Sequence, residues 1–598
     1  MDRARAPMLL RQLVPPGLLA ATLALVLAQS GVWPQGSAAA RVSAPFPAGI
    51  PGTYLFGRVV RASNGMPVPD ARVTLYLPDL SVFHERRTDS RGRYLFALTD
   101  PGSYRFGIAL PGFEYVERDA NLAAGSALLC TTRLVPEAHG GAWEVIGDTL
   151  PEVLDATDIG VLRPDGTIFY CHDTSDPIVL DPRTGAKNLP VSSGSEQGCM
   201  NGTLLEDGSV LLAGGQDGSS PGSFRDAISW VKEFHLDQTW TQLGDMLAPT
   251  GRWYPGLARL ADGRLLVMGG GTAPSAARTD TCEIYDPSTG AWSFTGSMGS
   301  AVEFPPSALL LDGRVLRTWG TIPELYDPST GAWTPTGAFA FPSRGYPGHS
   351  DHSLLVLSDG RAAAIGIRRL EQPSAPMVEF FDSVTEAWTP GSSPDRTRMQ
   401  CEVVLLPDGR VLVQGGDQET TAGPEPNVLG IVKRCDLFDP GSEAWRRVAD
   451  TLVFREYHAV TLLVPDGRVV TTGGTRIKFQ VGPTSSNVDA YSPPYLFRGV
   501  RPRIGSVSDT TPARGTTLSF DVFPETALTS VVLLGMQSTT HWVDGGIPRR
   551  VELPVSQSGT DVQVVLPSDQ NALPLGWYLL FAMVDDIPSE GVVVRVDA

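Results

Sequence analysis

The sequence has 598 residues and a formal net charge of −18. A chain of this length exceeds what one hydrophobic core supports, so the length predicts several domains. The acidic balance argues against a nucleic-acid-binding protein, because phosphate contacts require clustered Lys and Arg side chains. The six cysteines show neither CxxC spacing nor a zinc pattern, and they do not indicate a disulfide scaffold.

The first residues carry the three-part pattern of a secretory signal. Arg3, Arg5 and Arg11 precede the apolar run "GLLAATLALVLA", and small residues follow as "SAAA" before Arg41. We expect residues 1–40 to be a signal peptide and the protein to be secreted or otherwise extracytoplasmic. A membrane anchor is the alternative, but a 12-residue apolar run is short for a spanning helix. We expect no membrane span once the signal is removed.

Residues 52–133 contain short alternating strands separated by Gly, Pro and Asp turns, such as "ARVTLYL" and "GRYLFAL". This pattern predicts a small immunoglobulin-like β-sandwich. The stretches "GMPVPDARVTLYL" and "TDSRGRYLFALTDPGSYRFGI" resemble carboxypeptidase-regulatory-like or transthyretin-like domains. Such domains usually act as spacers or adhesive units, so we assign this region no chemistry.

From about residue 141 an Asp-Gly turn recurs in steps of 42 to 58 residues, usually followed by an apolar strand. A second turn signal, frequently with a tryptophan, follows each one, as in "YDPSTGAW" and "FDPGSEAW". Self-similarity near 50 residues with four strands per unit is typical of a kelch-type β-propeller. Seven units predict seven blades over residues 141–497. The turn aspartates are Asp165, Asp207, Asp262, Asp312, Asp359, Asp408 and Asp466.

One strand of this repeat lies out of place. "GAWEVIG" (141–147) precedes the first unit and matches "GAWSFTG" and "GAWTPTG" in later units, whereas the last unit has no such strand of its own. We expect the early strand to complete the seventh blade and to close the ring, because closure removes an exposed sheet edge.

Residues 500–598 return to alternating strands, including "TTLSFDVF" and "WYLLFAMV", and predict a second β-sandwich. The expected fold is therefore all-β: a seven-bladed kelch-type β-propeller flanked by two immunoglobulin-like β-sandwiches. No long helix is expected.

The Asp-Gly turns place the innermost strands of the seven units in a common register. Residues eight positions before each turn should lie at one level around the central axis. Cys199 and Tyr254 come from neighbouring blades, so their side chains could touch. The seven positions are Thr157, Cys199, Tyr254, Phe304, Asp351, Gln400 and His458.

Tyr457 precedes His458, and successive side chains of a regular strand face opposite ways. Both can serve one site only if the strand is irregular. The spacing from an arginine to the turn aspartate is 10 residues in two units but 11 in the seventh, as one extra residue in a β-bulge would produce. The pairs are Arg252–Asp262, Arg398–Asp408 and Arg455–Asp466.

Residues 141–598 resemble the copper radical oxidases, the galactose oxidase and glyoxal oxidase family. The likeness rests on "RWYPGLARLADGRLLVMGG", "REYHAVTLLVPDGRVVTTGG", "STTHWVDGGIPRRVELP" and "PLGWYLLFAMVDDIPSEGVVVRV". It implies that Cys199 is thioether-linked to Tyr254, which also binds copper, and that Tyr457 is the axial tyrosine. His458 and His541 match the two histidine ligands, the latter on a hairpin of the last domain.

Imidazole and oxygen ligands with an open tetragonal position suit Cu(II). The resemblance implies a secreted mononuclear copper radical oxidase that converts a primary alcohol or aldehyde into the aldehyde or carboxylic acid while O₂ becomes H₂O₂. The substrate would be a small-molecule alcohol or aldehyde, carbohydrates included. Tyr457 would accept the substrate hydroxyl proton, and a radical on the Cys199-linked Tyr254 would abstract hydrogen from carbon.

The sequence departs from galactose oxidase beside the radical tyrosine. Thr272 stands where that enzyme has a stacking tryptophan, and Trp253 directly before Tyr254 is more similar to the glyoxal oxidase branch. Galactose is therefore not the expected substrate. Candidate pocket residues are Trp253, Phe304, Asp351, Arg398 and Gln400.

The alternative function is a non-catalytic extracellular kelch propeller that binds a glycan or a protein through its loops. It predicts neither copper nor a thioether. It also leaves the shared register of Cys199, Tyr254 and His458 without a cause.

Overall fold

The structure is a computed structural model, and its chain divides into two compact units. One consists of Met1–His139 and Tyr495–Val500, the other of Gly140–Pro494 and Arg501–Ala598. The predicted signal peptide lies almost wholly outside the described residues. Within the described residues no helix is long and apolar enough to cross a membrane. The structure describes residues 40–41, 53–61, 65–76, 82–98, 100–110, 116–124, 126–134, 140–146, 159–172, 175–194, 197–217, 227–273, 277–320, 322–341, 352–367, 375–394, 396–417, 433–474 and 487–598.

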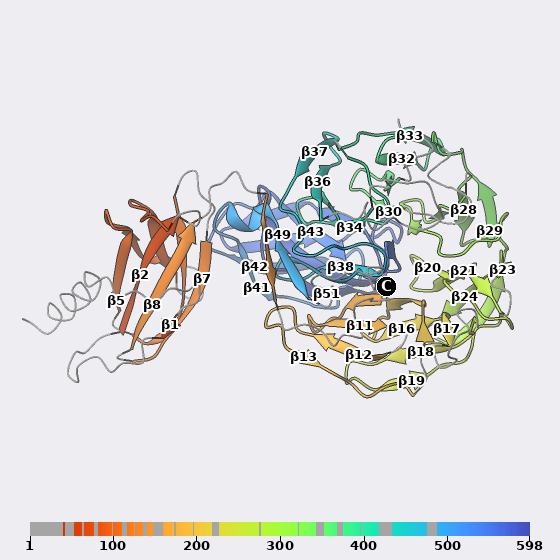
Figure 1. Ribbon diagram of the computed structural model, residues 1–598, viewed down its shortest axis with the longest axis horizontal. Helices are drawn as coiled ribbons and strands as arrows, with labels where there is room; N and C mark the ends of the chain where they lie inside the picture. The colour runs from red at the N-terminus through yellow and green to blue at the C-terminus, as the bar shows by residue number, and fades with distance from the viewer. Residues whose placement is uncertain are drawn as a thin grey trace, which may run out of the picture. The chain divides into compact units, whose positions relative to one another are not determined.

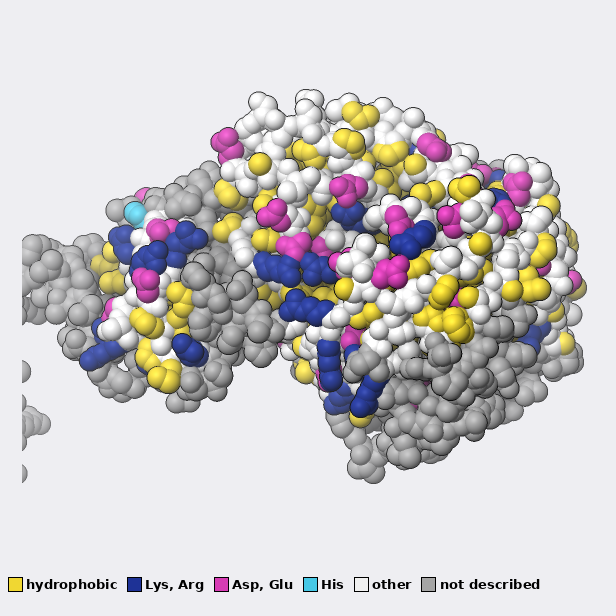
Figure 2. Space-filling view, turned by 90° about the horizontal axis from the view of Figure 1, so that it is seen from above, with side chains coloured by type: hydrophobic (Ala, Val, Ile, Leu, Met, Phe, Trp, Pro, Cys, Tyr) yellow, Lys and Arg dark blue, Asp and Glu magenta, His cyan; other side chains and the backbone are white. Residues whose placement is uncertain are grey.

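Strands are the main regular secondary structure of the described residues, whose one helix is a 3-10 turn, Pro494–Phe497. The expected all-β fold is therefore confirmed. Figure 2 shows Lys and Arg side chains lying beside Asp and Glu on the face drawn. In several turns an arginine pairs with the turn aspartate two residues before it, as in Arg264–Asp262 at 2.8 Å.

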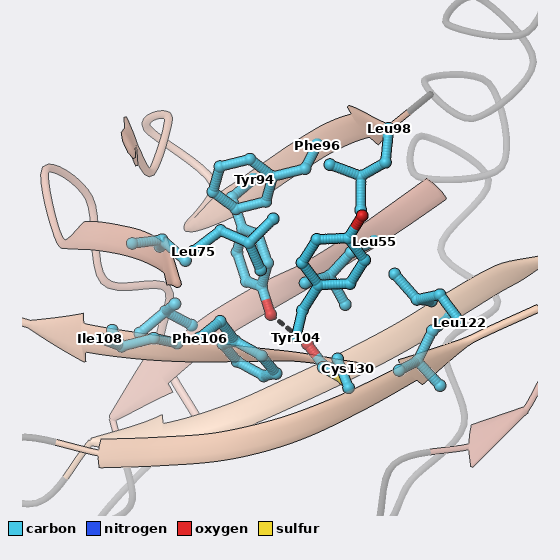
Figure 3. Packing of buried hydrophobic residues seen from close by; sticks show 14 of the residues in the cluster. Leu55, Leu75, Tyr94, Phe96, Leu98, Tyr104, Phe106, Ile108, Leu122 and Cys130 are labelled. Atoms are coloured by element: carbon cyan, nitrogen blue, oxygen red, sulfur yellow. Dashed lines mark hydrogen bonds between the residues drawn. The ribbon is translucent and has the colours of Figure 1, made fainter. Parts of the chain in front are cut away.

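The first unit is a β-sandwich of two four-stranded sheets, in the orders β1-β8-β2-β5 and β4-β3-β6-β7. Side chains of both sheets share one buried core, which includes Leu55 and Phe96 from one sheet and Phe106 from the other (Figure 3). The Tyr94 hydroxyl donates to the Cys130 carbonyl oxygen at 3.3 Å. The strands are β1 (Ala40–Arg41), β2 (Thr53–Arg61), β3 (Arg72–Tyr76), β4 (Val82–Arg87), β5 (Arg93–Leu98), β6 (Gly102–Ala109), β7 (Val116–Leu122) and β8 (Ala127–Leu134).

Seven antiparallel sheets of the second unit repeat one strand order, and Figure 1 shows them arranged radially. The first three are β10 (Ile159–Leu162), β11 (Ile168–His172), β12 (Ser175–Leu180) and β13 (Lys187–Asn188); β15 (Asn201–Leu204), β16 (Val210–Ala213), β18 (Val231–Phe234) and β19 (Trp240–Gln242); and β20 (Gly256–Arg259), β21 (Leu265–Met268), β24 (Cys282–Asp286) and β25 (Ala291–Thr295).

The next three sheets continue the same order along the chain. They are β26 (Ser307–Leu309), β27 (Val315–Arg317), β28 (Glu324–Asp327) and β29 (Ala332–Pro335); β30 (Ser353–Val356), β31 (Ala362–Ile365), β32 (Val378–Asp382) and β33 (Ala387–Pro390); and β34 (Glu402–Leu405), β35 (Val411–Gln414), β36 (Cys435–Asp439) and β37 (Ala444–Arg447). Two short two-stranded ribbons lie in the chain segments of the second and third sheets. They are β14 (Gln197–Gly198) with β17 (Gln216–Asp217), and β22 (Gly271–Thr272) with β23 (Ala277–Arg278).

The seventh sheet is β38 (Ala459–Leu463), β39 (Val469–Gly473), β40 (Asp489–Ser492) and β9 (Ala142–Val145). Its outer strand comes from the beginning of this unit: β9 pairs with β40 so that Trp143 lies opposite Tyr491. The Trp143 indole N–H also donates to the Ala449 carbonyl oxygen at 2.8 Å. The expected closure of the last sheet by the early strand is confirmed.

The repeated sequence signals have local physical causes. At the Asp-Gly turn of the third sheet, Asp262 accepts the Arg264 N–H at 3.1 Å, and Gly263 has a φ of 90°, which only glycine adopts readily. The repeated outer-strand tryptophan packs across the strand pair on an aromatic residue, with ring centroids 4.9 Å apart for Tyr285 and Trp292. Equivalent pairs are Tyr326–Trp333, Phe381–Trp388, Phe438–Trp445 and Tyr491–Trp143.

The carboxy-terminal domain is a second β-sandwich around a shared core that includes Leu518, Leu533 and Tyr578. One sheet has the order β41-β42-β48-β47, and the other β46-β43-β49-β50 with β51 paired to β49. The strands are β41 (Arg503–Val507), β42 (Thr517–Phe523), β43 (Ser530–Gly535), β46 (Arg550–Leu553), β47 (Val555–Ser558), β48 (Asp561–Val565), β49 (Gly576–Val584), β50 (Ile587–Pro588) and β51 (Val592–Val596).

One hairpin of this domain leaves its sandwich and joins the first radial sheet. It consists of β44 (Ser538–Thr540) and β45 (Val543–Asp544). Strand β44 pairs with β10, the innermost strand of that sheet, so that Thr539 lies opposite Gly160. The hairpin therefore lies against the innermost strands of the radial sheets.

Candidate metal centre

Five described residues that stand eight positions before an Asp-Gly turn share one unusual backbone conformation. Their φ angles lie between 51° and 67°, a left-handed region that residues other than glycine rarely adopt. The Tyr254 N–H donates to the Cys199 carbonyl oxygen at 3.2 Å, and the Phe304 N–H to the Tyr254 carbonyl oxygen at 2.8 Å. Three neighbouring sheets are thus linked at one level. The five residues are Cys199, Tyr254, Phe304, Gln400 and His458; Thr157 and Asp351 lie outside the described residues.

Cys199 and Tyr254 belong to one buried cluster at this level. Cys199 is 5% exposed and Tyr254 9% exposed, and both pack with Phe304 and with Trp542 of the hairpin. The Phe304 ring meets the Tyr254 ring edge-on, with centroids 5.0 Å apart. The thiol and the phenol are therefore enclosed together, largely away from solvent.

Tyr457 and His458 present both rings to the same place although they are adjacent in sequence. Their rings stack with centroids 4.1 Å apart and an interplanar angle of 26°. The residues form a turn before β38, in which the Ala459 N–H donates to the Glu456 carbonyl oxygen at 2.8 Å. Strand β38 then pairs continuously with β39. The expected bulge within the strand is thus wrong: the extra residue lies in the turn ahead of it.

Two phenols and two imidazoles converge beside this cluster. The Tyr254 and Tyr457 hydroxyls are hydrogen-bonded to each other, and His541 Nε2 lies 3.5 Å from the Tyr254 hydroxyl oxygen. The His541 ring centroid is 4.4 Å from that of His458 and 4.8 Å from that of Tyr457. Thr540 Oγ1 bonds His541 Nδ1 at 2.9 Å, which leaves Nε2 directed at the phenols.

This donor set fits a copper ion. Two imidazole nitrogens and two phenol oxygens are the nitrogen and oxygen ligands that Cu(II) accepts in tetragonal sites. The direction of His541 Nε2 is fixed, because the other ring nitrogen, Nδ1, is held by the Thr540 hydroxyl. Tyr254, Tyr457, His458 and His541 are the residues that would hold the ion.

Two of the candidate pocket residues, Trp253 and Phe304, contact rings of this site, and a third, Gln400, stands at the equivalent position of its own sheet. Trp253 packs against Tyr254, with ring centroids 4.8 Å apart, and its backbone bridges to Gly271. The Phe304 ring lies 4.7 Å from that of His541. Gln400 is 5% exposed at the same level of its own sheet. The fourth candidate, Asp351, lies outside the described residues.

The structure gives Arg398 a role in the fold rather than in a pocket. Its side chain is fully buried, and its guanidinium donates to Asp436 at 2.7 Å and to the Val413 carbonyl oxygen at 3.1 Å. Two other sheets hold an arginine in the same manner, and the expectation that Arg398 lines the pocket is corrected. These equivalent ion pairs are Arg252–Glu283 and Arg455–Asp489, both at 2.7 Å between fully buried side chains.

Sequence reasoning missed Thr540 and Trp542, which flank His541. Trp542 is 5% exposed, and its ring meets Phe304 edge-on at 5.4 Å. The signal was the tripeptide "THW" itself, in which a polar and an aromatic residue flank the histidine.

Comparisons with known proteins agree with this architecture. The family described as "Galactose oxidase-like, Early set domain" matches residues 501–596. The "Kelch motif" matches residues 258–299, and the "Carboxypeptidase regulatory-like domain" matches residues 55–135.

The curated relatives are about a quarter identical to this chain over the aligned residues. "Aldehyde oxidase GLOX" of Vitis pseudoreticulata is 26% identical over 509 residues, 73% of this chain and 91% of that protein. "Galactose oxidase" of Gibberella zeae is 25% identical over 202 residues, 32% of this chain and 28% of that protein. A "WSC domain-containing protein" of Arthroderma benhamiae is 26% identical over 445 residues, and the match spans 67% of this chain and 45% of that protein.

A solved structure shows the same fold. It is a fungal alcohol oxidase of the AA5 family in complex with copper, with a TM-score of 0.62 and 19% identity, covering 77% of this chain and 100% of that one. The chain thus combines a carboxypeptidase regulatory-like domain, a kelch motif and a galactose oxidase-like early set domain, and it resembles the galactose oxidase and glyoxal oxidase proteins.

Proposed function

We propose that this protein is a secreted copper-dependent oxidase that converts a primary alcohol or an aldehyde into the aldehyde or the carboxylic acid. The observation that carries the proposal is the convergence of Tyr254, Tyr457 and His541 with the ring of His458. The relatives named aldehyde oxidase and galactose oxidase support this reaction class.

The architecture proposed for this function is a single seven-bladed propeller. The seven radial sheets are its blades, and the hairpin of the last domain brings His541 to the axis. Residues 1–40 would direct the chain to export and would be absent from the mature enzyme.

A bound copper ion would accept one of the two electrons that alcohol oxidation releases and would bind the substrate oxygen. The second electron would be accepted by Tyr254 as a tyrosyl radical. A thioether bond to Cys199 would lower the energy needed to oxidise the ring. The enclosure of Cys199 and Tyr254 in one buried cluster supports this bond.

Tyr457, as the phenolate that a bound copper ion would favour, is the proposed acceptor of the substrate hydroxyl proton. Its hydroxyl already shares a hydrogen bond with that of Tyr254, so it lies beside the group that would take hydrogen from carbon. Removal of two hydrogens yields the carbonyl product, and their transfer to O₂ yields H₂O₂. A hydrated aldehyde offers the same hydroxyl and carbon hydrogen.

The pocket would select small substrates by aromatic contact. Phe304 lies edge-on to both Tyr254 and His541, and Trp253 covers Tyr254 from the preceding position. The Trp253 indole N–H is buried without a partner among the described residues, which leaves it able to donate to a substrate oxygen. Gln400 would add a polar side chain at the same level.

The deciding experiment is a peroxide-coupled screen of primary alcohols and aldehydes on purified, copper-loaded protein. We expect about one copper per chain and H₂O₂ formation that His541→Ala and Tyr457→Phe each abolish. His235→Ala is the matched control, because His235 forms a surface group with Asp207 and Glu233 that could hold adventitious metal. Copper content and activity that depend on His235 instead of His541 would overturn the proposal. A protein that binds no copper but retains a glycan or protein ligand would establish the scaffold function.

A further inference from the structure

The hairpin that carries His541 is closed at its base by one carboxylate. Asp544 Oδ1 accepts the backbone N–H of Ser538 at 3.1 Å and that of Gly546 at 2.7 Å. The Gly545 N–H donates to the Ser538 carbonyl oxygen at 2.7 Å across the same base. A carboxylate that accepts two backbone N–H groups holds both ends of the hairpin in one geometry.

Two hydrogen bonds connect the second oxygen of this carboxylate with the seventh sheet. Asp544 Oδ2 accepts the Gln537 side-chain amide N–H at 3.3 Å. Gln537 Oε1 in turn accepts the backbone N–H of Leu463 at 3.2 Å. Leu463 is the last residue of β38, the strand that begins directly after Tyr457 and His458.

The same hairpin is also attached to two other sheets. Strand β44 pairs with β10 of the first sheet, and the Ser538 hydroxyl donates to the Gly202 carbonyl oxygen in the second at 2.7 Å. The second sheet follows Cys199 in the chain, whereas β38 follows Tyr457 and His458. The contact from Gln537 to Leu463 therefore joins the hairpin that carries His541 to the strand that follows Tyr457 and His458, and these are two of the three parts of the chain that supply the proposed ligands.

We propose that Asp544 and Gln537 form a hairpin lock that sets the position of His541 relative to Tyr457 and His458. Both are positioning residues, because they act through the hairpin and through β38 and touch no reacting atom. This inference rests on the proposed copper function. The lock itself consists of hydrogen bonds that exist without any metal, so it can be tested separately.

Two single substitutions break the lock at different points. Asp544→Asn preserves one oxygen for Ser538 and Gly546 but places an amide N–H group opposite the donating amide of Gln537. Gln537→Leu removes the link to Leu463 and leaves Asp544 intact. We expect each variant to weaken Cu(II) binding about ten-fold, the lower end of the effect of supporting residues around metal ligands.

A double substitution should restore the lock with its polarity reversed. In Asp544→Asn combined with Gln537→Glu, the new carboxylate accepts the Leu463 N–H with one oxygen and the amide N–H from position 544 with the other. The total charge is unchanged. We expect the double variant to bind Cu(II) within about two-fold of wild type, which independent effects of the two single changes would not produce.

Three measurements decide between the outcomes: Cu(II) affinity by competition titration, the Cu(II) electron paramagnetic resonance spectrum, and hydrogen exchange of the metal-free protein. We expect faster exchange at Leu463 and in residues 538–546 in both single variants, with altered copper spectra, and recovery of all three signals in the double variant. Asp382→Asn is the control, because Asp382 also accepts two backbone N–H groups, from Val384 and Thr385, but in an outer turn. It should leave all three signals unchanged.

Normal hydrogen exchange in both single variants would show that the lock does not exist. Faster exchange with wild-type copper affinity and spectra would show that the lock does not position His541. Wild-type protein that binds no copper would overturn the proposed function, while its hydrogen exchange would still report on the lock.

Discussion

The backbone N–H of Tyr254 donates a hydrogen bond across two neighbouring sheets to the carbonyl oxygen of Cys199, 3.2 Å away. Both residues have left-handed φ angles, 51° and 52°, so each strand starts with the same local turn. Their side chains consequently enter one buried cluster. This relationship underlies the first prediction.

Aerobic copper loading should join Cys199 and Tyr254 covalently. Peptide mass spectrometry should find the two segments linked, lighter by two hydrogens and resistant to reductants that cleave disulfides. Cys199→Ser should still bind copper, because sulfur is not a proposed ligand, but should lose most activity, because an unmodified phenol is harder to oxidise. Separate peptides after loading, or full turnover by the serine variant, would contradict the radical chemistry.

Thr540→Val should weaken Cu(II) binding about 10-fold to 100-fold, because His541 Nδ1 loses the hydroxyl 2.9 Å away that fixes the orientation of its ring. Thr540→Ser retains the hydroxyl and should bind nearly as wild type. Competition titration with a chelator measures both affinities. Equal affinities for the two variants would remove Thr540 from the support of His541.

Arg398→Met should lower stability rather than alter substrate binding. The substitution removes a charged hydrogen bond to Asp436, at a cost of about 2 kcal/mol in the free energy of unfolding. Asp436 keeps its contacts to Arg434, at 2.7 Å, so it is not left unpaired. Urea unfolding measures the loss. An unchanged stability with a raised KM would return Arg398 to the pocket.

Trp143→Ala should destabilise the second unit by about 2 kcal/mol, because it removes a half-buried aromatic side chain from Tyr491 and a hydrogen bond to Ala449. Trp333→Ala provides the comparison, since Trp333 packs on Tyr326 in the same manner within a sheet whose four strands follow one another in the chain. Thermal unfolding should give similar losses for both. A negligible effect of the Trp143 change alone would mean that the early strand is not needed to complete the sheet.

Asp544 should make the protein less stable as the pH rises from about 4 to about 6. Burial raises the pKa of Asp544 from 3.8 to about 6, so the folded protein binds a proton in this range that the unfolded chain has released. The stabilising contribution of the proton is present below pH 4 and is lost as the pH passes the folded pKa, by at most about 3 kcal/mol. Asp544→Asn should remove this pH dependence from the free energy of unfolding of the metal-free protein, measured by urea unfolding at several pH values. The same change in the free energy of unfolding with pH in wild type and in Asp544→Asn would contradict the raised pKa of Asp544.

Local sequence patterns determined most of the fold. The Asp-Gly turns recur because Asp262 and its equivalents accept the N–H two residues later and glycine adopts the φ of 90° that follows. The repeated tryptophan marks the outer strand because it packs on an aromatic residue directly across the strand pair. These are short-range effects, so a single sequence reveals them. Even the closure by Trp143 was visible, because its strand repeats the motif of the other outer strands.

Tertiary structure alone decided what surrounds the site. Tyr457 and His458 face one place because the extra residue forms a turn with a left-handed His458, and the spacing of 11 residues could not distinguish that turn from a bulge. Arg398 had the right position for a pocket residue, but its long side chain reaches the buried carboxylate of Asp436 two strands away. Gln537 and Leu463 are 74 residues apart in the chain. Only the packing of the hairpin against β38 brings them together, because hydrogen bonds between distant segments depend on how whole domains dock and leave no periodic trace in the sequence.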